Sequence, residues 1–264
     1  MIKKGIYLGF IILLFILTIG GVIRASVWLD LPSLPPPELY GNIIIDRVST
    51  VSGVKPVTFS HWSHRLKHTC RVCHFELEIN MVTNTTMITE ELNKYGRFCG
   101  ACHDGKTAFG HTRENCDKCH NGDIGYGKEK FKSLSKLPPA PHGNGVDWVK
   151  AFKEGIIKPA NYVLEEYRPL EFVRSVTIES PWAGISPIIF PHEDHGDLLD
   201  CSNCHPEIFN IRKKGTKNLA MKSILNYEFC GVCHGKVAFP PNDNCKRCHP
   251  GMKHPGRTFD ERVH

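Results

Sequence analysis

The chain has 264 residues, enough for one or two domains. Its hydrophobic fraction of 41% is ordinary, but 23 glycines and 18 prolines leave few long periodic stretches from which to build a side-chain core. The formal net charge of +6 would permit a nucleic-acid partner, yet no basic run interleaved with aromatic residues occurs, so we expect no nucleic-acid binding.

The N-terminal segment, residues 1–27, is predicted to be a signal anchor. Its apolar run from Ile6 to Ile23 is just long enough to span a bilayer as a helix. Lys3 and Lys4 precede the run, which orients the N-terminus to the cytoplasm. No clean small-residue cleavage site follows, so an uncleaved transmembrane helix is favoured over a cleaved signal peptide. Either reading exports the rest of the chain, to the periplasmic side of the inner membrane.

Residues 28–52 read as a spacer that ends in a strand. Prolines at positions 32 and 35–37 predict an extended, semi-rigid segment. The stretch 43–51 is rich in β-branched residues and is bounded by Gly41 and Gly53, which predicts a short strand.

Six C-x-x-C-H pentads dominate the remaining sequence and use all 12 cysteines. The pentads are Cys70/Cys73/His74, Cys99/Cys102/His103, Cys116/Cys119/His120, Cys201/Cys204/His205, Cys230/Cys233/His234 and Cys245/Cys248/His249. This spacing is that of c-type haem attachment: two thiols reach the two vinyl groups of one porphyrin, and the adjacent histidine becomes the proximal iron ligand. Six covalently attached c-type haems are therefore expected, and they would supply the apolar bulk that the side chains lack.

The cysteines could also serve in zinc sites or disulfides. Zinc knuckles use four thiolates for each metal, and an exported chain can carry disulfides. Neither requires a histidine directly after the second cysteine, and here the histidine is present in every pentad. The propionates of the haems would also make the mature protein mildly acidic despite its basic sequence.

An internal repeat divides the chain into two copies. The segment 53–64 recurs as 184–195, at an offset of 131 residues that the first and second pentads keep. We therefore predict module 1 at residues 53–123 and module 2 at 184–252, with a linker at 124–183 and a tail at 253–264. Within the linker, Trp148, Ala151 and Phe152 fall at helical spacing, which predicts a short helix that packs against a module.

Each module opens with an H-x-x-H pair, His61/His64 in module 1 and His192/His195 in module 2. The first histidine of each pair lies nine residues before the first pentad, far enough to cap the opposite face of that haem. The second histidine can point toward a neighbouring haem. The other histidines without a repeated counterpart are expected at the surface; they are His68, His142, His254 and His264.

F-x-H-x-x-H followed by closely spaced C-x-x-C-H sites resembles class III multihaem cytochromes c, the cytochrome c3/c7 group, and in particular tandem c7-type trihaem domains. The resemblance implies mostly irregular structure with short α-helices and a few short strands, packed around the haems. It also implies that His61 and His192 cap the haems on Cys70/Cys73 and Cys201/Cys204. His64 and His195 would then cap those on Cys99/Cys102 and Cys230/Cys233.

The sixth ligand of the third haem in each module is less determined, and tandem arrays of this type can use methionine. Met221 lies nine residues before Cys230 and is assigned to module 2. The same position in module 1 is Glu90. Met87, one turn away, is preferred there, with His111 and Met81 as alternatives.

Two functions follow as hypotheses. If every iron has two protein ligands, no substrate can bind, and the chain carries single electrons between a membrane quinol-oxidising complex and a downstream redox protein, with no catalysis. In the alternative, one third haem is open and the chain is a reductase of a nitrogen or sulfur oxyanion. All six pentads end in histidine and no acid/base cluster stands out near them, so the carrier is preferred.

Overall fold

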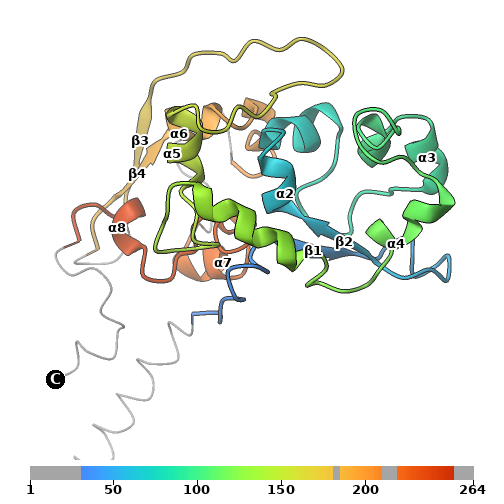
Figure 1. The fold of residues 1–264 in the computed structure, drawn as a ribbon. Coiled ribbons are helices and arrows are strands. Elements are labelled where there is room, and N and C mark those ends of the chain that lie inside the picture. Colours follow the sequence, from blue (N-terminus) through green and yellow to red (C-terminus); the bar gives the residue numbers. More distant parts are fainter. Residues whose placement is uncertain (1–30, 181–184, 210–218, 253–264) are drawn as a thin grey trace, which may run out of the picture.

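The computed structural model describes residues 31–180, 185–209 and 219–252 (Figure 1). The predicted anchor at 1–27, the tail and the histidines at 254 and 264 lie outside these ranges. Within the described ranges, no helix is long and apolar enough to cross a membrane.

An antiparallel β-hairpin of the same register leads into the first helix of each module. Strand β1 (Asn42–Ile45) pairs with β2 (Val57–Ser60), and β3 (Ser175–Ile178) pairs with β4 (Ile188–Pro191). The strand expected over 43–51 ends at Ile45, because a series of turns follows it. β3 was not expected, and it lies inside the predicted linker. The structural repeat therefore begins earlier than the sequence repeat, on each hairpin's first strand.

The modules then run through matching short elements. Helices α2 (His61–Arg65) and α6 (His192–Gly196) follow the hairpins and carry the H-x-x-H pairs. Helices α3 (Glu90–Lys94) and α7 (Met221–Leu225) precede the second pentads, which lie in the 3-10 turns Phe98–Ala101 and Phe229–Val232. The third pentads form α4 (Cys116–Cys119) and α8 (Cys245–Cys248), and the first lie in a π-helical turn, Val72–Glu76, and a 3-10 turn, Cys201–Asn203.

A glycine inside each second pentad lets two of these elements touch. A Cβ at Gly100 would lie 1.8 Å from the carbonyl oxygen of Asn93, at the end of α3. At Gly231 it would lie 2.0 Å from the carbonyl oxygen of Ile224 in α7. Any larger residue would push the haem-binding turn off its helix, so the repeated glycine is a packing requirement of the site.

The linker supplies much of the side-chain core. Helix α5 (Trp148–Lys153) is capped by Asp147, whose carboxylate accepts a hydrogen bond from the backbone N–H of Lys150. Trp148 packs in one cluster with Trp62 of α2 and with Leu134 of the 3-10 helix Lys128–Lys136. At its other end, Lys153 forms an ion pair of 2.5 Å with Asp194 of α6. The linker thus contacts both modules, and the two hairpins lie on opposite sides of the molecule (Figure 1).

Candidate haem sites

Each pentad forms about one helical turn. In five of the six, the backbone N–H of the histidine donates to the backbone carbonyl of the first cysteine at 2.8–2.9 Å, as in the bond from His103 to Cys99. Residues three and four apart lie on the same face of such a turn, so the thiols and the imidazole share one side. A porphyrin lying on that side can receive two thioether bonds and one axial ligand.

All ten histidines predicted to bind iron hold their rings in the same way. The Nδ1 atom of each contacts a backbone carbonyl oxygen at 2.6–3.1 Å. The ten are His61, His64, His74, His103, His120, His192, His195, His205, His234 and His249. A metal-bound histidine usually donates its other ring N–H to such a partner, which fixes the tautomer and the ring orientation. The Nε2 atom of each ring is thereby left as the candidate ligand.

Three of the predicted axial pairs face each other at one distance. The ring centroids of His61 and His74 lie 6.3 Å apart, with an interplanar angle of 16°. The pairs His64/His103 and His195/His234 lie 6.2 Å apart, tilted by 53° and 55°. Two metal–nitrogen bonds of about 2 Å, plus about 1.1 Å from each Nε2 to its ring centre, give about 6.2 Å. An iron between two imidazoles fits this spacing without rearrangement.

The protonation states suit haem attachment. Burial lowers the pKa of His61 to about 3 and that of His234 to about 4, so these rings are neutral ligands at pH 7. Burial raises the pKa of the Cys73 and Cys233 thiols to about 12. All twelve cysteines are free thiols, and no cluster of three or more metal-binding side chains occurs in the described part of the chain. The zinc and disulfide readings therefore gain no support here.

One cavity of about 1380 Å³ runs through both modules. It exceeds the roughly 300–1,000 Å³ of a pocket for one small ligand. Residues from five pentads line it, among them Cys70, Cys99, Cys204, Cys233 and Cys248. The remaining pentad, that of α4, does not line the cavity. The chemistry and size of this lining fit several porphyrins lying side by side.

The fourth predicted pair is not assembled. The ring of His192 packs edge-on against Phe172 and Phe190, and His205 packs against Phe209. No ring contact joins the two histidines, both of which lie in described segments. His205 is close in sequence to residues 210–218, which lie outside the described ranges.

Two histidines expected at the surface are partly buried instead. His68 and His142 both line the cavity, which corrects the sequence-based expectation. His68 approaches the Cys102 sulfur at 3.9 Å, and the His142 Nε2 atom lies 3.2 Å from the Arg247 guanidinium. The sequence repeat does not mark His68 and His142, because neither has a counterpart in the other module. Proximity to a haem is set by the tertiary fold here and not by the repeat.

The candidates for the sixth iron ligand of the third haem are placed differently in the two modules. Met221 lines the cavity together with His249, the residue directly after α8, whose haem it would cap. Its equivalent, Glu90, begins α3 and forms an ion pair of 2.5 Å with Lys94. Met87 is 57% exposed and lies outside the cavity.

Met81, the remaining alternative, does line the cavity. His111 is exposed; it is an electrostatic neighbour of Glu90 and lies against the backbone of His103. Glu90 also neighbours His120, the proximal histidine of that third haem. His111 and His120 therefore share Glu90 as an electrostatic neighbour, which makes His111 the preferred candidate in module 1.

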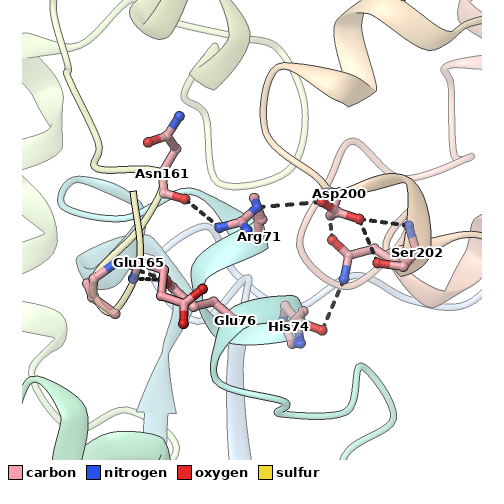
Figure 2. Close-up of polar contacts among 9 residues, drawn as sticks. Arg71, His74, Glu76, Asn161, Glu165, Asp200 and Ser202 are labelled. Carbon is pink, nitrogen blue, oxygen red and sulfur yellow. Dashed lines mark hydrogen bonds and ion pairs between the residues drawn. The ribbon is translucent and has the colours of Figure 1, made fainter. Parts of the chain in front are cut away.

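The modules meet along their first pentads, as Figure 2 shows. Arg71, inside the first pentad of module 1, lies 3.6 Å from the carboxylate of Asp200 and donates to the carbonyl of Asn161. Asn203, inside the first pentad of module 2, donates from its side-chain amide to the carbonyl of His74 at 3.0 Å. The two haem-binding turns are thereby fixed directly to each other.

Comparisons with known proteins agree with this site. The family described as cytochrome c7 and related cytochrome c matches residues 57–121 and 188–250. Similar solved structures include the C-terminal hexahaem fragment of GSU1996, at 24% identity over 82% of this chain and 99% of that one, with a TM-score of 0.27. Dodecahaem cytochrome c GSU1996 is 25% identical over 81% and 75% of the two chains, with a TM-score of 0.28.

The N-terminal hexahaem fragment of GSU1996 is 25% identical over 80% and 99%, with a TM-score of 0.26. No curated protein sequence matches the chain significantly. The two family matches fall on the two repeats, and each covers three haem-binding pentads. The chain is therefore a multihaem c-type cytochrome with two tandem domains of the cytochrome c7 family.

Proposed function

We propose that this protein carries single electrons through six covalently bound haems, without a substrate-binding iron. The observation that carries the proposal is the set of opposed imidazole pairs at 6.2–6.3 Å. An iron held between two imidazoles has no open position. Each haem would supply a one-electron Fe(III)/Fe(II) couple.

The chain's residues would serve this function by fixing the cofactors. The carbonyl contacts at Nδ1 would keep each imidazole oriented, so the ligand set would not change between oxidation states. The S–H bonds of the cysteines would add across the porphyrin vinyl groups, which would leave neutral thioethers and release nothing. A rigid ligand set keeps the reorganisation on electron transfer small.

The haem attachment sites form a continuous series across both modules. The Cys99 thiol neighbours Cys119, and the Cys73 thiol neighbours Cys99. Across the module boundary, Cys233 neighbours Cys70, and within module 2 Cys230 neighbours Cys248. Such a series supports exchange of electrons between the two modules.

Several parts of the proposal rest on sequence alone. We place the haem domains on the periplasmic side of the inner membrane, held by the segment 1–27. The partners would be a quinol-oxidising membrane complex and a downstream redox protein, one or both as subunits of a respiratory complex. In this proposal the ten histidines are axial ligands, Met221 completes module 2 and His111 completes module 1.

A second function is favoured by a specific feature of module 1. Its third pentad lies outside the shared cavity, Cys116 is exposed, and a glutamate replaces Met221 at the equivalent position. If no side chain reached that iron, it could bind and reduce a small nitrogen or sulfur oxyanion.

Haem counting combined with low-temperature EPR of the oxidised holoprotein tests the two functions. Six haems per chain that are all low-spin, with no binding of carbon monoxide after reduction, is the result expected for a carrier. A high-spin signal together with carbon monoxide binding would support the reductase and contradict the carrier. A folded protein with fewer than six haems would contradict the haem assignment itself.

A further inference from the structure

Arg65, at the end of α2 in module 1, reaches across to module 2. Its Nη1 atom donates to the carbonyl oxygen of Val237 at 2.7 Å, three residues after His234. Its guanidinium lies over the ring of Trp148 in the linker, 4.9 Å from the ring centroid. Arg65 also lines the haem cavity. One side chain therefore contacts module 1, module 2, the linker and the cavity.

This arginine has no carboxylate partner. No ion pair within 4.0 Å is formed by Arg65 in the described ranges, whereas Arg71, Arg97 and Arg168 each have an acidic partner. An arginine keeps its charge in proteins, and a desolvated charge is costly unless it is paired. Its half-buried charge is therefore left without a compensating anion among the described residues.

The acidic groups near Arg65 carry no negative charge once the haems are attached. They are the thiols of Cys70 and Cys233, together with the hydroxyl of Tyr40. Haem attachment converts both thiols to neutral thioethers. The Tyr40 hydroxyl is already used as a donor to the carbonyl of Ala238, and burial raises its pKa to about 12, so it stays neutral. None of the three can balance the guanidinium in the mature protein.

We propose that Arg65 binds a propionate of a haem at the module boundary, one of the two attached at Cys70/Cys73 and Cys230/Cys233. A guanidinium pairs with a carboxylate through two parallel N–H···O bonds, and propionates are the carboxylates that haem brings into this cavity. This inference rests on the haem attachment of the proposed function. It adds an assigned role for Arg65, which is to set the potential of a boundary haem and to lock the two modules around it.

The test compares Arg65→Gln with the wild-type holoprotein by spectroelectrochemistry, resonance Raman spectroscopy of the propionate bending modes, and NMR of the haem methyl groups. Loss of the positive charge favours the ferric state. We expect about a three- to tenfold change in the ferrous/ferric ratio of one haem, equal to about 30–59 mV for one electron. The propionate band and the methyl signals of the same haem should shift.

Arg168→Gln is the matched control, because this substitution removes the same charge from a side chain that is 91% exposed. It should leave all potentials and the propionate bands unchanged. Arg65→Lys keeps the charge but loses the planar fork, and should give a smaller shift of the same band. The haem whose methyl signals move identifies which of the two boundary haems is bound.

Unchanged potentials and Raman bands in an Arg65→Gln protein that carries six haems would overturn the inference, as would a shift confined to a haem away from the boundary. If that variant fails to mature, a structure of the wild-type holoprotein decides: the guanidinium of Arg65 lies within about 3 Å of a propionate oxygen or it does not. A wild type with fewer than six haems would instead contradict the proposed function, which keeps the two failures distinct.

Discussion

Module 1 and module 2 share one frame and differ at their first and third haem sites. Both place a hairpin, an H-x-x-H helix and a glycine-bearing second pentad in the same order, and both form the same imidazole pair at 6.2 Å between the H-x-x-H helix and the second pentad. They differ where the third haem must find its second ligand, since module 2 has Met221 and module 1 has Glu90 in an ion pair. The second haem site is copied between the modules, whereas the first is assembled as a histidine pair only in module 1 and the third differs in its candidate sixth ligand.

The cavity divides the haem sites in another way. The first pentad of module 1 lines the shared cavity, and the third pentad of module 1 does not. Cys70→Ala/Cys73→Ala should therefore remove apolar bulk from both modules. We expect loss of the folded holoprotein, or a cost above about 3 kcal/mol, which is a Tm lower by about 6–12 °C.

Cys116→Ala/Cys119→Ala is the matched control for this change. It should yield a folded protein that has lost one haem, with a Tm within a few degrees of wild type. Haem content by mass spectrometry and melting by circular dichroism check both variants. Equal losses of stability would mean that the cavity does not carry the fold.

Exchange of one histidine for methionine tests whether the matched pairs are equivalent. His64→Met and His195→Met should each raise the potential of one haem by on the order of 0.1 V, since methionine favours the ferrous state. The two rises should be alike because the two ring pairs have the same separation and tilts of 53° and 55°. Spectroelectrochemical titration measures them, and a rise in only one module would show that the frames are not equivalent.

The third haem is where the modules should respond differently. Met221→Ala should open one iron in module 2, and His111→Ala should open one in module 1. The expected result is a high-spin EPR signal from one haem in each variant, with binding of carbon monoxide after reduction.

Controls for these variants are Met252→Leu, which changes another cavity-lining methionine, and Met87→Leu, which changes the exposed methionine near α3. Both should remain low-spin. If Met87→Leu became high-spin and His111→Ala did not, methionine would be the ligand in both modules, and the difference between them would be smaller than proposed.

The junction of the modules should respond to pH through Asp200. Burial alone would raise the pKa of this carboxyl, but hydrogen bonds from Ser202 and the charge of Arg71 hold it below its usual range. The stability that Asp200 provides is therefore complete above the unfolded pKa of about 3.9 and is lost as the pH falls through the lower folded pKa. Asp200→Asn should cost about 1–2 kcal/mol at pH 7 and should flatten the acid side of the stability curve.

Glu78→Gln is the control for Asp200, because Glu78 forms an ion pair with Arg97 on the surface. Removing it should change the free energy of unfolding by less than about 0.5 kcal/mol. Urea unfolding between pH 3 and pH 7 measures both variants. If Asp200→Asn retained the pH dependence of wild type, the Arg71 contact would not contribute to stability.

Sequence reasoning could reach the features that the repeat marks. The pentads, the H-x-x-H pairs and the placement of a helix around Trp148 follow from local spacing. The structure brings three of the four predicted histidine pairs together and leaves His192 and His205 apart. The strand β3, the position of His68 and the role of Arg65 do not follow from spacing. Each depends on contacts between segments far apart in the chain, such as the bond from Arg65 to Val237. Because haem contacts come from both modules and the linker, no single stretch of sequence contains them.

The smallest expected difference between the modules concerns the start of α3 and α7. Thr89 caps α3 by accepting a hydrogen bond from the backbone N–H of Leu92, and the same position before α7 is Ala220, which has no capping side chain. Thr89→Ala should cost about 0.5–2 kcal/mol, and Ala220→Ser should add up to about 1 kcal/mol. Each helix packs on a second pentad through Gly100 or Gly231, so the change should appear locally as altered amide exchange at that pentad. Suppose that Thr89→Ala lowered amide protection at Gly100 while Ala220→Ser added none at Gly231. A contact other than the cap would then be ordering α7, and Met221 bound to iron is the residue on that helix able to provide it.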